Sequence, residues 1–296
     1  MTRYLYDHGL PFEKELAPNL DDLQKRINKR KASLMIISGG VGEGKTTLAV
    51  HIADYINKIN GRPPITFDGP QMAMGGVDFL KKLRVCYDEK LPCIIYDEAG
   101  DFSKRSSLTK FNAVINRTFE TFRAFKCLVI LCLPNFDILD NQLFDNQIPR
   151  LLIRCHGRSE SYGNFDAYGL NEMMFLKYWF KKSPIKNYAY GRVYPNFYGH
   201  FLDLEPDRSK ELDEVSMKNK KEILKKSEIK IEGLLSYPEL AQKLGITIDY
   251  TRLLVCKLKL KPARSISRVK YYTPDQLAQL EEMIDRPDGR GRPRGS

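Results

Sequence analysis

The stretch that decides the fold is Ile36-Ile37-Ser38-Gly39-Gly40-Val41-Gly42-Glu43-Gly44-Lys45-Thr46-Thr47. An apolar run at 34–37 leads into it, and a short apolar run that ends at a glycine-rich turn is typical of a buried β-strand. After the turn, apolar residues recur at helical spacing, which predicts a helix over 46–59. These residues are Leu48, Ile52, Tyr55 and Ile56. The core of the chain therefore begins with a strand, a tight turn and a helix.

The turn has the spacing G-x-x-x-x-G-K-[ST], which is typical of loops that bind nucleotide phosphates. Glycines let the backbone curl so that successive N–H groups point at one anion, and the helix N-terminus adds positive potential. We expect Lys45 to reach the β- and γ-phosphates of ATP and Thr46 to ligate Mg²⁺. The residues expected to contact nucleotide are Gly39, Gly40, Val41, Gly42, Glu43, Gly44, Lys45, Thr46 and Thr47. A glycine-rich turn that binds nothing is the alternative.

A second apolar run, 93–96, ends in two acids, Asp97 and Glu98. Buried parallel strands deliver side chains to a site at their carboxyl ends. We expect Asp97 to hold the Mg²⁺ shell and Glu98 to polarise the attacking water. The alternative is a strand-end acid that caps the following helix.

Apolar runs alternate with helical patterns along the first two thirds of the chain. Strands are predicted at 34–37, 65–67, 93–98, 127–133 and 151–156, and helices at 20–31 (capped by Asn19), 46–59, 77–83 and 107–125. This alternation predicts an α/β fold, a three-layer P-loop ATPase core with a mainly parallel sheet, over residues 1–204. The segment 157–204, rich in Tyr and Phe, is interpreted as loops and edge strands.

The loop together with Asp97 and Glu98 resembles the additional-strand, catalytic-glutamate group of P-loop ATPases. Residues 119–126 and the following run at 127–133 resemble the FtsK/HerA-like and zonula-occludens-toxin-like motors. This resemblance implies a polar residue that senses the γ-phosphate at Asn135, where FtsK/HerA-like proteins usually have Gln. Asn135, with Asp137 and Asp140 behind it, is closer to AAA+ ATPases, so the subfamily stays open.

Such ATPases gain catalysis from an arginine that a neighbouring subunit supplies. The candidates, in order of preference, are Arg150, Arg123 and Arg154. The alternative is that each of them is a surface or strand-flanking arginine. The partition-protein pattern is disfavoured because Ser38 stands where its signature lysine belongs.

Charge is unevenly distributed over the 296 residues. The net charge is +11, and residues 217–296 contribute 18 Lys/Arg against 10 Asp/Glu, which is +8 of that total. A basic end segment favours a polyanionic partner, and duplex DNA is the partner we expect.

Residues 231–285 are predicted to form a small helical domain with helices at 236–244, 247–260 and 273–284. The pattern, with Gly245 at a turn, resembles a winged or MerR-like helix-turn-helix module, whose second helix would enter the major groove. The expected DNA contacts are Tyr250, Arg252, Lys257, Arg264, Arg268 and Lys270. A small helical domain for protein contacts is the alternative.

Two further segments flank this domain. Residues 205–230 are highly charged and predict a solvated helical linker. Residues 286–296 resemble an AT-hook, which implies minor-groove contacts by Arg290, Arg292 and Arg294. A disordered basic tail is the alternative.

Six cysteines show no C-x-x-C pair and no metal-like spacing, which favours reduced thiols in a cytoplasmic protein. No apolar run reaches the ~18 residues of a membrane span. The sequence as a whole predicts a DNA-stimulated ATPase that moves or remodels duplex DNA and acts as a homo-oligomer. The role expected for it is translocation, packaging or replication for a virus or mobile element. An ATP-switched DNA-binding regulator is the alternative, and a small-molecule kinase is the least favoured.

Overall fold

The structure is a computed structural model that describes residues 5–29, 33–97, 126–159, 162–183, 186–229, 233–266 and 269–284. The chain divides into two compact units, Met1–Val215 and Ser216–Ser296. Each unit is described by itself. In the described residues, no helix is both long enough and apolar enough to cross a membrane.

Unit 1 is built around one seven-stranded sheet with the order β2-β3-β4-β1-β5-β6-β7. The strands are β1 (Leu34–Ser38), β2 (Met72–Met74), β3 (Cys93–Asp97), β4 (Leu128–Leu133), β5 (Pro149–His156), β6 (Tyr162–Tyr168) and β7 (Phe197–Leu202). The pairings from β2 through β5 are parallel, and β6 and β7 add two antiparallel strands. The predicted α/β fold with a mainly parallel sheet is therefore confirmed.

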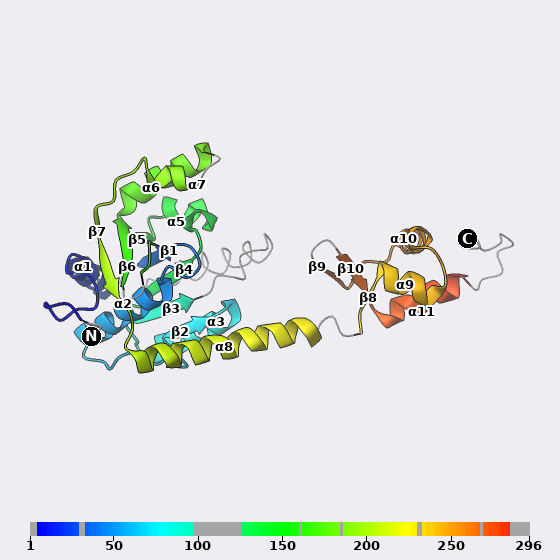
Figure 1. The fold of residues 1–296 in the computed structure, drawn as a ribbon, viewed down its shortest axis with the longest axis horizontal. Coiled ribbons are helices and arrows are strands. Elements are labelled where there is room, and N and C mark those ends of the chain that lie inside the picture. Colours follow the sequence, from blue (N-terminus) through cyan, green and yellow to red (C-terminus); the bar gives the residue numbers. More distant parts are fainter. Residues whose placement is uncertain are drawn as a thin grey trace. The chain divides into compact units, whose positions relative to one another are not determined.

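Helices cover both faces of this sheet (Figure 1). One face packs against α1 (Leu16–Asn28) and α2 (Lys45–Ile59), together with the start of α8 (Pro206–Ile229). The other packs against α3 (Gly76–Asp88), η3 (Phe136–Ile138), α5 (Asn141–Asp145), α6 (Leu170–Lys182) and α7 (Lys186–Tyr190). Strands β1 and β4 are buried along their whole length, as their continuous apolar sequences require when both faces are covered.

Two predictions near the amino end are wrong, one of a helix start and one of a strand. Helix α1 begins at Leu16, so Asn19 lies inside it and donates its side-chain amide to Glu15 O at 2.9 Å instead of capping the helix. No strand forms at 65–67. The backbone N–H of Ile65 donates to Asp54 and its carbonyl accepts from Arg208, so both of its backbone groups are occupied by side chains.

The Tyr-rich segment 157–204 contains more regular structure than predicted. Strands β6 and β7 agree with the expected edge strands, but α6 and α7 occupy positions interpreted as loops. Helix α6 buries Met173, Leu176 and Phe180 at helical spacing. Its exposed side is also rich in aromatic residues, so the sequence lacks the polar face that normally marks a surface helix. The helix predicted at 107–125 lies outside the described residues.

Unit 2 contains three helices and a three-stranded antiparallel sheet of order β8-β10-β9 within its described residues. Its elements are β8 (Leu235–Ser236), α9 (Tyr237–Leu244), α10 (Ile248–Lys257), β9 (Arg264–Ile266), β10 (Val269–Tyr272) and α11 (Pro274–Ile284). Helix α9 begins with a capping box between Ser236 and Glu239, and Gly245 ends it in a left-handed conformation with φ +61°. Helix α10 is four residues shorter than the predicted 247–260, because it begins one residue later and ends three residues earlier.

The predicted linker forms the single helix α8. Its first turns belong to unit 1, because Leu212 is buried in the core of that unit. Five of the six cysteines are buried as free thiols, and Cys256 is exposed.

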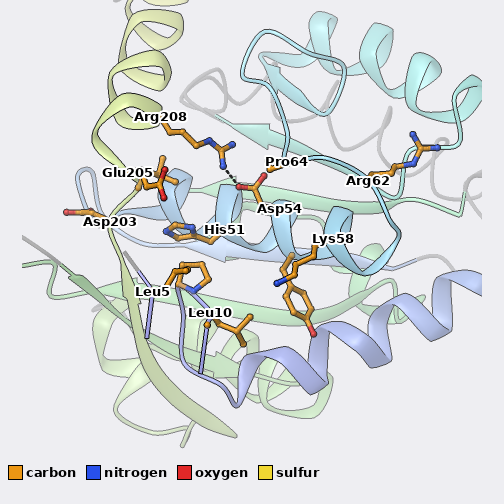
Figure 2. A pocket seen from close by; sticks show the side chains of 14 residues that line it. Leu5, Leu10, His51, Asp54, Lys58, Arg62, Pro64, Asp203, Glu205 and Arg208 are labelled. Carbon is orange, nitrogen blue, oxygen red and sulfur yellow. Dashed lines mark hydrogen bonds and ion pairs between the residues drawn. The ribbon is translucent and has the colours of Figure 1, made fainter. Parts of the chain in front are cut away.

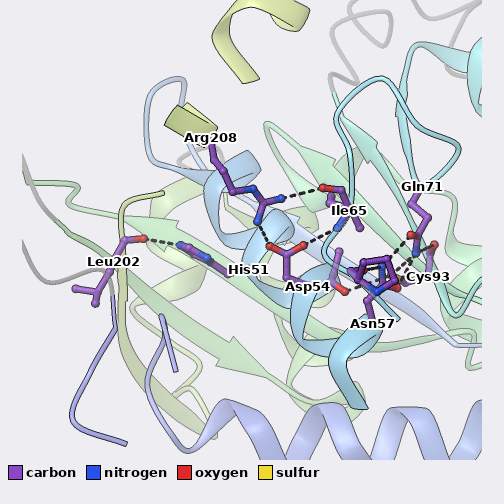
Figure 3. A network of polar contacts seen from close by, with 10 residues as sticks. His51, Asp54, Asn57, Ile65, Gln71, Cys93, Leu202 and Arg208 are labelled. Carbon is purple, nitrogen blue, oxygen red and sulfur yellow. Dashed lines mark hydrogen bonds and ion pairs between the residues drawn. The ribbon is translucent and has the colours of Figure 1, made fainter. Parts of the chain in front are cut away.

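A row of polar side chains on α2 fastens this helix to distant segments (Figure 3). His51 bonds Leu202 O at the end of β7 at 2.8 Å, and Asp54 forms an ion pair with Arg208 of α8. Asn57 and Gln71 exchange two amide hydrogen bonds of 2.8 and 2.9 Å. The helix that begins at the glycine-rich turn is therefore fixed by polar contacts at three positions spaced three residues apart.

A cavity of about 470 Å³ opens beside this row (Figure 2). His51, Asp54 and Lys58 of α2 line it, with Asp203 and Arg208 opposite. None of the lining residues belongs to the 39–47 turn. The cavity is therefore separate from the predicted nucleotide site.

The row makes unit 1 sensitive to acid through His51. Burial, with a smaller contribution from the charge of Arg208, lowers the pKa of His51 from 6.5 to about 4, although the hydrogen bond with Leu202 O acts in the opposite direction. Below pH 6.5 the unfolded chain binds this proton more readily than the folded one, so stability falls as the pH falls. We expect His51→Gln to remove about 2 kcal/mol of the stability loss between pH ~7 and pH ~5.

Chemical denaturation followed by the fluorescence of Trp179, the single tryptophan, measures this difference in unit 1. Variant and wild type should have the same pH dependence above pH ~7, where unfolded-state histidine is already neutral. An acid-induced loss that is equal in both proteins would contradict this role for His51.

Candidate functional site

The glycine-rich turn follows β1 directly and ends where α2 begins. Gly39, Gly42 and Gly44 have φ values of +155°, +84° and +78°, which side chains rarely adopt. Val41 is fully exposed at the tip of the turn. The backbone therefore has the curled form that the motif requires, at the carboxyl edge of a parallel sheet, where ligands of such folds bind.

The turn rests on residues that the motif does not include. A Cβ atom on Gly39 would lie 2.5 Å from Cys155 O, and one on Gly44 would lie 2.8 Å from the ring of Phe201. The Arg158 backbone N–H donates to Glu43 at 3.2 Å, and the Arg158 side chain pairs with Asp203. Cys155 lies near the end of β5, and Phe201 lies in β7.

Sequence reasoning missed these supporting residues. One signal was available, because Gly163 interrupts a strand pattern and such a glycine marks a close approach. The ring of Phe201 lies against it, at 2.2 Å from a Cβ placed there. Nothing in the local sequence of Arg158 or Asp203 pointed to the turn.

The turn and the end of β3 are joined by one hydrogen bond. Thr46 Oγ1 donates to Asp97 Oδ2 at 2.9 Å across 51 residues of sequence. Lys45 Nζ donates to Gly40 O at 2.6 Å, which holds the ammonium group against the turn. Lys45, Thr46 and Asp97 thus lie together as predicted, whereas Glu98 lies outside the described residues.

The pair formed by Thr46 and Asp97 fits a magnesium ion. Hydroxyl and carboxylate oxygens are the ligands that Mg²⁺ prefers, and the ion usually takes its remaining ligands from phosphate oxygens and water. No group of three or more His, Cys, Asp or Glu side chains suited to a metal occurs in the described part of the chain. When bound, the ion would neutralise charge on the phosphate oxygens.

Two buried thiols form the floor beneath the turn. Cys132 Sγ lies 3.9 Å from Lys45 O, and burial, with the charge of Asp97, raises the pKa of Cys132 well above its ordinary value. Burial raises the pKa of Cys155 to about 12. Both thiols therefore stay neutral and act as small apolar groups.

Asn135 follows β4, whose carboxyl end lies between those of β1 and β3. Its side chain accepts from the Asp137 N–H at 3.0 Å and caps η3. This hydrogen bond fixes the amide group at the same edge of the sheet as Lys45 and Asp97. The sensor role predicted for Asn135 remains a prediction.

The candidate arginines lie at different ends of the sheet. Arg150 follows the first residue of β5 at the edge opposite the turn, where the register shifts beside Leu34 and Met35. Arg154 is the register partner of Ser38, at the edge of the turn, and its guanidinium lies 4.0 Å from the Tyr190 ring centroid. Arg150 is therefore too far along the strand to serve the turn of its own chain, and Arg123 lies outside the described residues.

The predicted DNA contacts in unit 2 are only partly described. Arg252 and Lys257 are exposed on α10 and Lys270 is exposed on β10, while Tyr250 is half-buried. Arg252 forms an ion pair of 2.9 Å with Asp249. The side chain of Arg264 and the residues Arg268, Arg290, Arg292 and Arg294 lie outside the description.

Gly44 offers a test of the support beneath the turn. We expect Gly44→Ala to destabilise unit 1 more than Gly42→Ala, because both positions have positive φ but only Gly44 faces Phe201. Left-handed strain costs about 1 kcal/mol at both positions, and overpacking adds about 1–3 kcal/mol at Gly44. Chemical denaturation of the two matched variants gives the difference, and equal losses would exclude the contact with Phe201.

Comparisons with known proteins give only distant similarity. No protein-family model matches the chain, and no curated protein matches it. One similar structure is the HORMA, CdnC and Trip13 complex of E. coli MS115-1, with 16% identity, a TM-score of 0.32, and coverage of 48% of this chain and 58% of that one. The ATPase DotB of Legionella pneumophila has 11% identity, a TM-score of 0.29, and coverage of 58% and 56%.

Drosophila ORC bound to DNA has 12% identity, a TM-score of 0.31, and coverage of 95% of this chain and 88% of that one. The matches to the first two structures span less than two thirds of those chains. At these TM-scores the similarities assign no family.

Proposed function

We propose that this chain is an ATP-hydrolysing protein that moves or remodels duplex DNA. Unit 1 binds ATP with Mg²⁺ in the 39–47 turn, and unit 2 holds the DNA. The protein acts as a homo-oligomer, so that an arginine of one subunit reaches the nucleotide of the next.

The hydrogen bond between Thr46 and Asp97 is the single observation that carries the proposal. A glycine-rich turn alone occurs in proteins that bind no nucleotide. A hydroxyl at the start of the helix, bonded to a strand-end carboxylate beside the lysine, is the arrangement that phosphate and Mg²⁺ require. Three chemical groups from two distant segments meet at one edge of the sheet.

The sheet order also supports the additional-strand group of ATPases. Strand β4 lies between β1, which leads into the turn, and β3, which ends at Asp97. Its carboxyl end leads to Asn135, which suits a residue that senses the γ-phosphate. Glu98 would then activate the water, as the resemblance implies, and hydrolysis would follow by in-line attack on the γ-phosphate.

We infer that unit 2 is the winged helix-turn-helix module that binds duplex DNA. Support comes from α9, the left-handed turn at Gly245 and α10, with the β9–β10 hairpin as the wing. Lys257 and Lys270 are exposed and can contact phosphates. The Arg252–Asp249 ion pair has to open before Arg252 contacts DNA.

A regulator that assembles on DNA in its ATP-bound state is the second candidate. The exposed ion pair of Arg252 favours it, because a specific base contact can replace that pair when DNA binds. A small-molecule kinase is the least favoured, since the 470 Å³ cavity contains none of the turn residues.

ATP turnover tests the nucleotide site. We expect Lys45→Ala to lower the hydrolysis rate by at least about 100-fold, because the transition-state charge loses its ammonium partner, while DNA binding is kept. Lys58→Ala, at an exposed position on the same helix, is the matched control and should hydrolyse ATP at the wild-type rate. Hydrolysis by Lys45→Ala at the wild-type rate would rule out the site.

Turnover measured across a duplex DNA titration separates the candidates. A motor should be stimulated strongly by DNA, whereas a regulator should turn over slowly and respond weakly. Phosphate transfer to an added small molecule would identify a kinase.

DNA binding by unit 2 is tested by salt dependence. We expect the double variant Lys257→Ala, Lys270→Ala to lower the slope of log K against log salt by about 2, because two phosphate contacts are lost. Lys243→Ala, on the exposed side of α9, is the control and should keep the wild-type slope. An unchanged slope in the double variant would place the DNA elsewhere.

A further inference from the structure

An unexplained surface lies on unit 1, on the outer side of α6 and α7. Helix α6 carries Tyr178, Trp179 and Lys182, and the α7 region carries Tyr188 and Arg192. We call these five residues the α6–α7 array. The nucleotide site uses none of them.

The five side chains form one continuous series of contacts. Lys182 Nζ lies 4.5 Å from the Tyr178 ring centroid, and the rings of Tyr178 and Trp179 meet edge to face at 5.6 Å. The Arg192 guanidinium lies 5.6 Å from the Trp179 ring and 4.6 Å from the Tyr188 ring. Two cations and three rings therefore form one series along the surface.

The exposed side of α6 differs from that of an ordinary surface helix. Its inner side is buried through Met173, Leu176 and Phe180. On the outer side, Phe175 is 61% exposed and Tyr178 is 48% exposed. Large rings that the fold leaves in solvent in such a group mark an interaction surface.

The charge around the array identifies the kind of partner. Residues 170–194 contain five Lys/Arg and one acid, Glu172. In the described part of the chain, neither Lys182 nor Arg192 has a carboxylate within ion-pair distance. The partner must therefore be anionic and must also offer flat faces to the rings.

We propose that the α6–α7 array binds single-stranded nucleic acid. Aromatic rings that stack on bases, set among cations that contact the backbone, are the combination that sequence-tolerant single-strand binders use. This site is additional to the duplex-binding surface proposed for unit 2, and it lies on the unit that carries the phosphate-binding turn.

A single strand fits the array better than a duplex does. In a duplex the base faces are stacked on each other, so only the phosphates could be used and the rings would stay idle. Cation–π contacts at exposed positions are weak, so Lys182 and Arg192 can turn from the rings to phosphates. The rings of Tyr178 and Tyr188 then become available to bases.

Trp179 is the only tryptophan of the chain, so its fluorescence reports on the array directly. The full-length protein is titrated, without nucleotide, with oligothymidylate of about 16 nucleotides, the upper range of single-strand sites. We expect the single strand to quench the fluorescence and a duplex of equal length to leave it nearly unchanged. Oligouridylate of the same length distinguishes RNA from DNA as the natural strand.

Matched variants separate stacking from charge, with affinity measured by anisotropy of a labelled strand. Tyr178→Ala and Tyr188→Ala should each weaken binding at least about fivefold. Tyr198→Ala, on β7 and 73% exposed, should change it less than about twofold. Lys182→Gln with Arg192→Gln should lower the single-strand salt slope by about 1.4, whereas Lys58→Gln on α2 should not.

Three results would overturn the proposal. Equal quenching by duplex and single strand would show that the array contacts phosphates only and does not bind bases. A blue shift with phosphatidylglycerol vesicles, and no response to oligonucleotides, would make it a membrane contact. Equal losses of single-strand affinity in Tyr178→Ala and Tyr198→Ala would show that bases do not stack on the array.

Discussion

The hydrogen bond from Thr46 to Asp97 depends on the register of the strands at the centre of unit 1. It forms only if α2 begins, and β3 ends, at the same edge of the sheet. Strand β4 sets that alignment, because it pairs in parallel with both β1 and β3 and is buried throughout. A shift of either pairing would carry Asp97 away from the turn. The register of the central sheet therefore determines the distance between Thr46 and Asp97.

Helix α2 has a second task, since it joins the turn to the outer parts of the unit. Asp54 and Arg208 pair within a half-buried site, where both charges have lost much of their hydration. The loss of hydration has a visible effect on Asp54, because burial raises the pKa of this carboxyl group despite the adjacent arginine. Removing one partner alone would leave the other charge poorly solvated. The pair therefore fixes the start of α8 on α2 more than it stabilises the fold.

The sequence was sufficient for the turn and for Asp97 because both are set by local patterns. A strand that ends in acids and a loop of fixed glycine and lysine spacing can both be recognised within a short window of sequence. Ile65 shows the limit of this approach, since its run is apolar but its backbone groups are occupied by Asp54 and Arg208. Partners that lie 11 and 143 residues away in the chain cannot be inferred from a local window.

The arginines show a related limit. Arg150 and Arg154 stand four residues apart in one strand, and their sequences give no reason to separate them. The pairing of β5 with β1 places Arg154 beside Ser38 and leaves Arg150 at the opposite edge. Strand register is a property of the sheet, so a local window of sequence does not show which of the two arginines lies at the edge of the turn. The contact of Phe201 with Gly44 of the turn likewise depends on the pairing of β6 with β7.

The helix that carries the α6–α7 array shares one core cluster with β1, the strand that leads into the glycine-rich turn. Leu176 and Phe180 on the inner side of α6 pack in the same cluster as Leu34 and Ile36 of β1, the strand that enters the turn. Packed cores shift between discrete arrangements more readily than they deform continuously. A strand bound at the array would thus load α6, which lies on β5 and β6, and a change at the turn would reach α6 through the side chains of this cluster. This shared packing gives a physical reason why a single-strand site would be placed on the unit that carries the glycine-rich turn.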